Sequence, residues 1–317
     1  MTKEAKISNI ICEEMVSAAE KDKHILAITC DSRGSASLKN FTEKFPKQTV
    51  EMGIAEQNAV SVSAGLAHVG ERPFVFSPAA FLTMRSIEQV KDDVAYSNTN
   101  VKLIGISGGN SYSYLGTTHH SLQDLAITRA IPNLEVYMPA DELQTRSLMR
   151  YLISSSKPAY VRIGKLPQPE IYKSEKTAFI KPGHANIVVD NGNDLALFAM
   201  GETLSIAVEV SRLLKKVNIN TKVIDLVSLK PLDVNLIKNI AKNCSNLISI
   251  EEHSIYGGIG AAIAEVISKR KDTKLNIVGF PDKPIIGGPQ LKVFDYYGLN
   301  AATIAQKAEK TFREENE

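Results

Sequence analysis

A single carboxylate stands at the start of a segment made mostly of small and apolar residues. Residues 51–70 read EMGIAEQNAVSVSAGLAHVG, and Glu56 falls where a helix is expected to begin. In the first turn of a helix, free amide groups and the helix dipole stabilise an anion by about 0.3–1 kcal/mol. The Ala, Ser and Gly residues that follow predict close packing, which would bury Glu56. A buried carboxylate needs a hydrogen-bond partner, and a ligand with a basic ring nitrogen would suit it.

An aromatic residue follows a nearby predicted strand. The segment FSPAAFLTMRSIEQVKDDVAY begins as the strand ends, and it places Phe81 ahead of an amphipathic helix. A lone Phe is most often part of a core. At the carboxyl end of a parallel strand, however, it lies where open α/β sheets bind ligands and where its ring can stack on a flat heterocycle.

Two adjacent histidines lie in a loop rich in Gly, Ser and Tyr. The stretch GGNSYSYLGTTHHSLQD contains His119 and His120, and Ser121 is expected to cap the helix that follows. Paired histidines can ligate a metal, but no Cys, Asp or Glu stands at a supporting spacing. Substrate binding or proton transfer is the better interpretation, because His titrates near neutral pH.

The order of apolar runs predicts a two-domain α/β protein. Short apolar or β-branched runs alternate with helical patterns, which is typical of a mainly parallel sheet. A segment rich in proline and charge, 166–185, interrupts this alternation before a second α/β unit begins. We therefore expect a first domain over 1–175 and a second over 176–317. The strands are expected at 24–30, 72–77, 101–107, 134–139, 159–164, 194–201, 221–229, 246–252 and 275–280, and the helices of the first domain near 5–20, 55–68, 84–96, 121–130 and 141–155.

Composition and motifs exclude several classes. The net charge is +2 and the basic residues are dispersed, so neither nucleic acid nor any other charged partner is indicated. No apolar run approaches the roughly 20 residues of a membrane span. Three scattered cysteines predict reduced thiols in a cytoplasmic protein. The P-loop, the dinucleotide-binding glycine motif and the GxSxG elbow are all missing.

Taken together and in order, six motifs resemble the C-terminal half of transketolases, and more specifically the separate C-terminal subunit of a split transketolase. The resemblance covers roughly residues 25–300. It implies a pyrimidine-binding domain followed by the family's C-terminal domain. The motifs are GIAEQN, FSPAAFL, GTTHHSLQD, ITRAIPN, MPAD and EEHSIYGGIGAAIAE.

The resemblance implies a role for each motif residue in binding thiamine diphosphate or a sugar. Glu56 is similar to the glutamate that hydrogen-bonds the N1′ nitrogen of the cofactor's aminopyrimidine and so activates it. Ile54 is similar to the apolar residue that helps hold the cofactor bent. Phe81 is similar to an aromatic that lines the pyrimidine pocket, and Met84 stands where the family has another pocket aromatic. His119 is similar to the histidine beside the reacting sugar atoms. Arg162, in YVRIGKLPQ, resembles the arginine that binds the substrate phosphate.

The sequence departs from the family on the acceptor side. Leu115 stands where transketolases have an acid that contacts a sugar hydroxyl, and Ser107 stands where they have a phosphate-side histidine. The usual pentose phosphates are therefore in question. A modified or less phosphorylated sugar becomes a hypothesis.

The GDG…N motif, which binds magnesium and the diphosphate in this family, is missing from the chain. The resemblance therefore implies an obligate N-terminal partner subunit that carries this motif and the Mg²⁺ ligands, in an α2β2 assembly that includes a dimer of this chain. No metal ligand is expected here.

Three alternatives stay open. One is a deoxyxylulose-phosphate synthase-like carboligase, and another is the β subunit of a 2-oxo-acid dehydrogenase. The third is a non-catalytic regulatory or scaffold subunit. The donor used by the assembled complex separates the first two from a transketolase, and loss of Glu56 separates the third.

Overall fold

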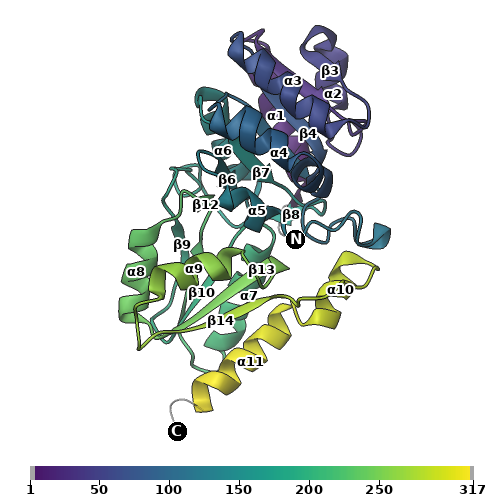
Figure 1. The fold of residues 1–317 in the computed structure, drawn as a ribbon. Helices are drawn as coiled ribbons and strands as arrows, with labels where there is room; N and C mark the ends of the chain where they lie inside the picture. The colour runs from purple at the N-terminus through teal and green to yellow at the C-terminus, as the bar shows by residue number, and fades with distance from the viewer. Residues whose placement is uncertain (1–3, 315–317) are drawn as a thin grey trace.

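The computed structural model describes residues 4–314, and it has one α/β sheet in each half of the chain (Figure 1). The first sheet has seven strands in the order β12-β6-β7-β5-β4-β2-β3, and all neighbours in it are parallel except the β12–β6 pair. These strands are β2 (Ile25–Thr29), β3 (Thr49–Glu51), β4 (Arg72–Pro78), β5 (Lys102–Ile106), β6 (Glu135–Tyr137), β7 (Ala159–Arg162) and β12 (Ser228–Lys230).

Helices cover both faces of this sheet because its strands are apolar on both sides. On one face α1 (Ile7–Ala19), α2 (Lys39–Lys44) and α6 (Glu142–Ser154) pack on alternate strand residues such as Ala27 and Phe76. The other face carries α3 (Glu56–His68) and an irregular helical segment, which pack on the intervening residues. The irregular segment consists of η2 (Phe81–Arg85), α4 (Ile87–Gln89) and η3 (Val90–Tyr96).

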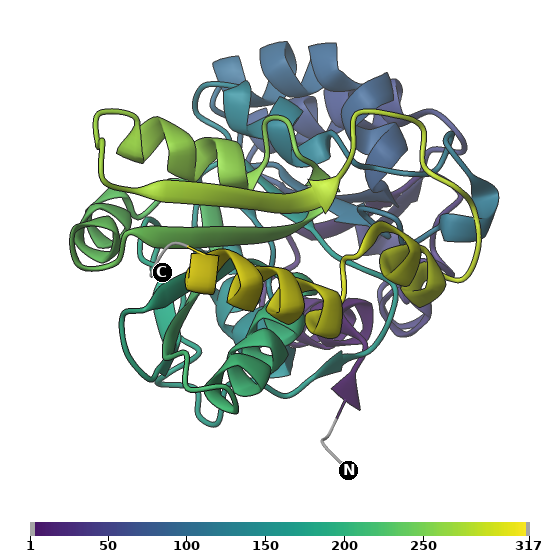
Figure 2. The same cartoon turned by 90° about the horizontal axis from the view of Figure 1, so that it is seen from below.

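The second sheet has five strands in the order β14-β13-β10-β11-β9, with only β9 antiparallel. Two helices, α7 and α11, cover one face, and α8 and α9 cover the other. Figure 2 shows α11 running beside β13 and β14. The elements are β9 (Asn186–Asp190), β10 (Leu195–Ala199), α7 (Thr203–Lys215), β11 (Thr221–Asp225), α8 (Val234–Asn243), β13 (Asn246–Ser254), α9 (Ile259–Ile267), β14 (Lys274–Phe280) and α11 (Ala301–Glu314).

The remaining elements are short and join or flank the two sheets. A two-stranded antiparallel pair joins β1 to β8. These elements are β1 (Glu4–Ala5), η1 (Pro46–Gln48), η4 (Ser113–Leu115), α5 (Asp124–Ala130), β8 (Gln168–Pro169) and α10 (Gln290–Tyr297). The boundary expected at 175/176 lies in the irregular connection between β8 and β9.

One strand of the second half crosses back into the first sheet. In β12, Ser228 pairs with Tyr137 and Lys230 with Val136 of β6. The Lys230 ammonium also donates to the backbone carbonyl of Arg129 at 3.1 Å. A single apolar cluster continues from the first domain onto α8 and α9, so the two domains share part of their core.

The α/β fold and all the expected strands are confirmed, although the run 221–229 divides into β11 and β12. Ser121 is not a helix cap. It pairs through its backbone with Gly109, and α5 begins three residues later at Asp124. The three cysteines are free and buried, and no helix within residues 4–314 is long and apolar enough to span a membrane.

Candidate active site

Three neighbouring parallel strands place the chemically useful side chains along one edge of the first sheet. The spatial order is β7-β5-β4, so the segments that follow these strands leave the sheet side by side. Phe81 and Arg85 follow β4, Tyr112 and His119 follow β5, and Lys165 follows β7. Ligands of open α/β sheets bind outside the carboxyl ends of the strands, which is where these five residues lie.

Glu56 is the first residue of α3, and its side chain is only 1% exposed. One carboxylate oxygen accepts a hydrogen bond at 3.0 Å from the hydroxyl of Ser77, which lies near the carboxyl end of β4. The other lies 2.5 Å from the Arg85 guanidinium, which is 42% exposed. The buried acid therefore has one buried neutral donor, Ser77, and one cationic donor, Arg85, that is partly exposed to solvent.

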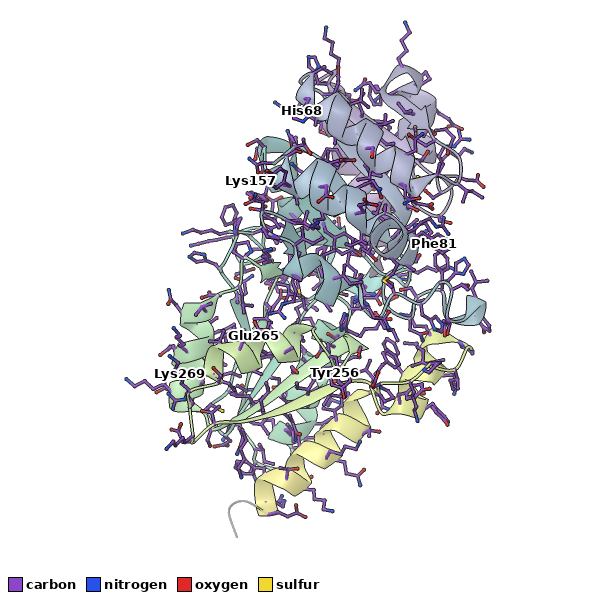
Figure 3. All side chains as sticks on the ribbon, viewed as in Figure 1. His68, Phe81, Lys157, Tyr256, Glu265 and Lys269 are labelled. Carbon is purple, nitrogen blue, oxygen red and sulfur yellow. The ribbon has the colours of Figure 1, made fainter. Side chains whose placement is uncertain are left out.

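Phe81 lies beside the same group. The Arg85 guanidinium carbon lies 4.5 Å from the centre of the Phe81 ring, a distance typical of cation–π contacts. Phe81 also contacts the His119 ring edge-on, and the two ring centres are 4.9 Å apart. In Figure 3, Phe81 lies at the side of the first domain from which the loop after β5 extends. Phe81 thus joins the Glu56 pocket to the histidine loop.

Glu56, Arg85 and Phe81 form a row of side chains, and His119 extends this row toward the end of β7. Its Nδ1 is 2.9 Å from the Thr118 hydroxyl, which leaves Nε2 to face a ligand. The Tyr112 ring lies edge-on at 5.7 Å, and the Lys165 ammonium lies 5.0 Å from the centre of the Tyr112 ring. Lys165 is exposed, so the far end of the row presents a cation to solvent.

The neighbouring His120 has a different environment. It is buried, and its Nε2 donates to the Ser113 carbonyl at 3.2 Å. Burial lowers the pKa of His120 below its usual value, so the ring is neutral at pH 7. Of the two adjacent histidines, His119 is the one that faces the candidate active site.

Ile54 and Met84 are exposed apolar residues, with 73% and 57% of their surfaces accessible. Ile54 stands two residues before Glu56, and Met84 stands one residue before Arg85. Both therefore flank the Glu56–Arg85 pair along the chain. Their role in lining a cofactor pocket stays a prediction.

Arg162 is not brought to this row. Its side chain is 1% exposed and lies between the two domains. Its Nη2 donates to the backbone carbonyl of Glu252 at 2.6 Å and lies 3.3 Å from the carboxylate of the same residue. Its Nη1 lies 3.5 Å from Asp124. We therefore correct the expectation that Arg162 binds the substrate phosphate, because protein acceptors already occupy both of its terminal nitrogens.

Four residues of the site escaped sequence reasoning: Ser77, Arg85, Tyr112 and Lys165. Ser77 and Lys165 each stand at or just beyond the carboxyl end of a parallel strand, and that position was the available signal. Nothing in the sequence pairs Arg85 with Glu56, because 29 residues separate them along the chain. Within residues 4–314, no group of three or more His, Cys, Asp or Glu side chains could hold a metal ion.

Two family models match the chain in the order of its domains. The transketolase pyrimidine-binding domain matches residues 3–168, and the transketolase C-terminal domain matches residues 183–304.

Curated relatives include proteins of the same length. The chain is 42% identical over 296 residues to an apulose-4-phosphate transketolase subunit of Phocaeicola vulgatus, covering 93% of this chain and 94% of that protein. It is 31% identical over 302 residues to a 6-deoxy-6-sulfo-D-fructose transketolase subunit of a Clostridium species, with coverage of 94% and 92%. It is also 32% identical to 1-deoxy-D-xylulose-5-phosphate synthase of Halothermothrix orenii, but it spans only 48% of that protein.

A solved structure with a similar fold is described as a split gene transketolase, an inactive beta4 tetramer. Its TM-score is 0.86 at 30% identity, covering 98% of this chain and 99% of that one. The family models and these relatives together show that the chain belongs to the transketolase family, with the two domains and the length of the C-terminal subunits of split transketolases.

Proposed function

We propose that this chain is the C-terminal subunit of an enzyme that transfers a two-carbon ketol unit from a ketose donor to an aldose acceptor. The observation that carries the proposal is the buried Glu56 carboxylate, whose partner Arg85 lies on Phe81, next to His119, at the carboxyl ends of β4 and β5. A carboxylate, an aromatic face and a histidine in one row suit the activation of a heterocyclic cofactor beside a sugar.

The residues present fit the aminopyrimidine half of thiamine diphosphate. Glu56 would hold the ring nitrogen and exchange a proton with it, because its carboxylate is 1% exposed and Arg85 can be displaced from it. Phe81 would offer its ring face, with Ile54 and Met84 as further apolar lining. When bound, this cofactor supplies the electron sink that carbon–carbon bond cleavage next to a carbonyl requires.

His119 and Lys165 would act on the sugar. His119 would hold or move the proton of a sugar hydroxyl through Nε2, since Thr118 fixes its other nitrogen. Lys165, exposed at the end of the row, replaces Arg162 as the proposed cation for an anionic group on the substrate. Both transketolase relatives have names that denote a sugar with a phosphate or a sulfonate group. We propose a non-standard sugar of this anionic kind, with Leu115 in place of the usual acid.

The diphosphate and its Mg²⁺ are proposed to lie on an N-terminal partner subunit that carries the GDG…N motif, in an α2β2 assembly. A related tetramer of beta chains alone is described as inactive, which supports the need for a second kind of subunit. The free cysteines favour a reducing compartment, and we propose the cytoplasm.

The test is reconstitution. The chain, expressed with an N-terminal partner and supplied with thiamine diphosphate and Mg²⁺, is expected to transfer a ketol unit between sugar phosphates, and the purified chain alone is not. Full activity of the chain alone would contradict the split-subunit proposal. The similarity to 1-deoxy-D-xylulose-5-phosphate synthase favours a carboligase as the second candidate. Decarboxylation of pyruvate without ketol transfer would support that candidate or the 2-oxo-acid dehydrogenase β subunit.

A further inference from the structure

A second cluster of side chains, charged except for Gln290, lies buried between the two domains. Arg162 and Asp124 come from the first domain, and Glu252, Glu202 and Gln290 come from the second. Each of the five is at most 8% exposed. Charged groups are almost never buried unless they are paired, so the contacts among these residues must compensate the cost of burial.

Glu252 is the residue that connects the others. One of its carboxylate oxygens pairs with Arg162 at 3.3 Å, across the domain boundary. The other accepts the backbone N–H of Asn110 at 2.7 Å and the side-chain amide of Gln290 at 3.1 Å. The same amide nitrogen of Gln290 lies 3.1 Å from Glu202. The Glu252 carboxylate therefore contacts the last residue of β7, the loop after β5 and the first residue of α10.

Burial and the neighbouring Glu252 charge raise the pKa of Glu202 well above its usual value. Burial also raises the pKa of Glu252, but the charge of Arg162 and the backbone N–H of Asn110 oppose that rise. The contacts with Arg162 and Asn110 therefore favour the anion of Glu252. The Asp124 carboxylate accepts a hydrogen bond from the Tyr160 hydroxyl at 2.7 Å and lies 3.5 Å from the Arg162 guanidinium.

Glycines make this close approach possible. A β-carbon at Gly108 would collide with the Arg162 side chain, and one at Gly109 would collide with both Arg162 and Glu252. A β-carbon at Gly164 would collide with Glu202. The glycines that follow β5 and β7 therefore leave the space that this charged cluster occupies.

The loop that follows β5, residues 109–121, carries His119 of the proposed site. Its base closes where Gly109 and Ser121 exchange two backbone hydrogen bonds, of 3.1 and 2.8 Å. Asn110, held by Glu252, is the next residue into the loop, and His119 lies near its other end. The position of His119 against Phe81 thus depends on a base that the second domain holds in place.

We propose that Glu252, supported by Gln290, is a positioning residue that fixes the loop 109–121 so that His119 faces the substrate. The second domain therefore contributes to ketol transfer through this carboxylate. This inference rests on the proposed function for its kinetic consequence, but its structural consequence can be measured without any activity.

A tryptophan in the loop reports its mobility. The chain contains no tryptophan, and Tyr114 in η4 is 76% exposed. In the full chain carrying Tyr114→Trp, Glu252→Gln is expected to lower the fluorescence anisotropy, because an amide cannot replace the anion that Arg162, Asn110 and Gln290 share. Glu209→Gln, which removes an exposed carboxylate of α7, is the matched control and should leave the anisotropy unchanged.

In the reconstituted complex without the tryptophan, Glu252→Gln should lower kcat at least tenfold and leave the apparent affinity for thiamine diphosphate within about twofold. If Glu252→Gln does not fold, the variant Gln290→Leu provides the test, because it removes the two hydrogen bonds that the Gln290 amide donates to Glu202 and Glu252 and leaves the Arg162–Glu252 ion pair intact. It should lower the anisotropy and reduce kcat several-fold.

A folded variant with unchanged anisotropy and unchanged kcat would overturn the inference. Equal losses of kcat and cofactor affinity would also overturn it, since they would indicate a general structural role. If the wild-type complex transfers no ketol unit, the proposed function fails, and the anisotropy of the chain alone still tests the loop.

Discussion

The Arg85 guanidinium lies 2.5 Å from the buried Glu56 carboxylate and also covers the Phe81 ring at 4.5 Å. One half-exposed cation therefore covers both of the groups proposed to receive the aminopyrimidine ring. In the chain on its own, Arg85 neutralises the acid. A cofactor nitrogen that binds Glu56 has to displace this cation.

Replacing Glu56 by Gln should abolish most of the turnover of the reconstituted complex. The amide keeps the hydrogen bond with Ser77 but cannot exchange a proton with the cofactor, so a loss of about 10²–10⁴-fold in kcat is expected. Stability should change by no more than about 1 kcal/mol, because Arg85 becomes hydrated when its partner is removed. Steady-state kinetics and urea unfolding measure the two effects. Unchanged turnover would instead favour a regulatory or scaffold subunit.

Replacing Lys165 by Met should weaken the binding of anionic sugars. KM for a phosphorylated substrate is expected to rise about 10-fold or more, with a smaller change in kcat, because a charged contact to the substrate is lost. Lys165→Arg should retain most of the affinity. Lys157→Met removes another exposed lysine, on the far side of the first domain from Phe81 (Figure 3), and serves as the control. Equal KM values for Lys165→Met and the wild type would exclude this residue as the anion site.

Replacing Arg162 by Met should destabilise the fold. The carboxylates of Asp124 and Glu252 would stay buried without their cation, at a cost of about 3–5 kcal/mol. The midpoint of urea unfolding reports this loss. Arg150→Met, which breaks an exposed pair with Glu175, is expected to cost less than about 1 kcal/mol. If Arg162→Met unfolds like the wild type but loses affinity for substrate, a phosphate-binding role would be restored to Arg162.

Acid should destabilise the chain through His253. This side chain is fully buried, and its Nδ1 donates to the Ser254 carbonyl at 2.7 Å while Nε2 accepts the Ala126 N–H at 3.3 Å, so the folded state requires a neutral ring. Burial lowers the pKa of His253 from 6.5 to about 4. The unfolded chain therefore binds more protons between these values, and stability falls as the pH falls from 6.5 to 4.

The loss attributable to His253 is on the order of 3 kcal/mol over that interval. Urea unfolding at several pH values measures it. His253→Gln, which cannot titrate, should show a smaller loss over the same interval. Parallel pH curves for the variant and the wild type would assign the acid sensitivity to other groups.

The sequence predicted the elements whose environment is local and repetitive. Residues 25–29 are recognisable because a strand buried on both faces is apolar throughout. Strand β3, with three half-exposed or exposed residues, has no such pattern, and the apolar run 221–229 predicts one strand where the structure has β11 and β12. Glu56, Phe81 and His119 could be found from motifs, and the structure does bring them into one row.

Arg162 and Lys165 show why the rest of the site could not be predicted. Both are cations within one short segment, and the resemblance of YVRIGKLPQ to the family indicates the arginine as the phosphate-binding residue. The residue that buries Arg162 is Glu252, 90 positions further along the chain, in the other domain. Only the folded arrangement shows that the arginine is already paired and that the lysine is exposed.

Strand β12 also limits how such chains can be divided or recombined. A fragment that ended at the expected boundary near residue 175 would leave the edge of β6 without its antiparallel neighbour, and exposed edges invite aggregation. A second domain taken from another protein would have to supply a strand that fits β6 as well as a glutamate that fits Arg162. Over evolutionary time, these two domains are therefore expected to be inherited together as a single module.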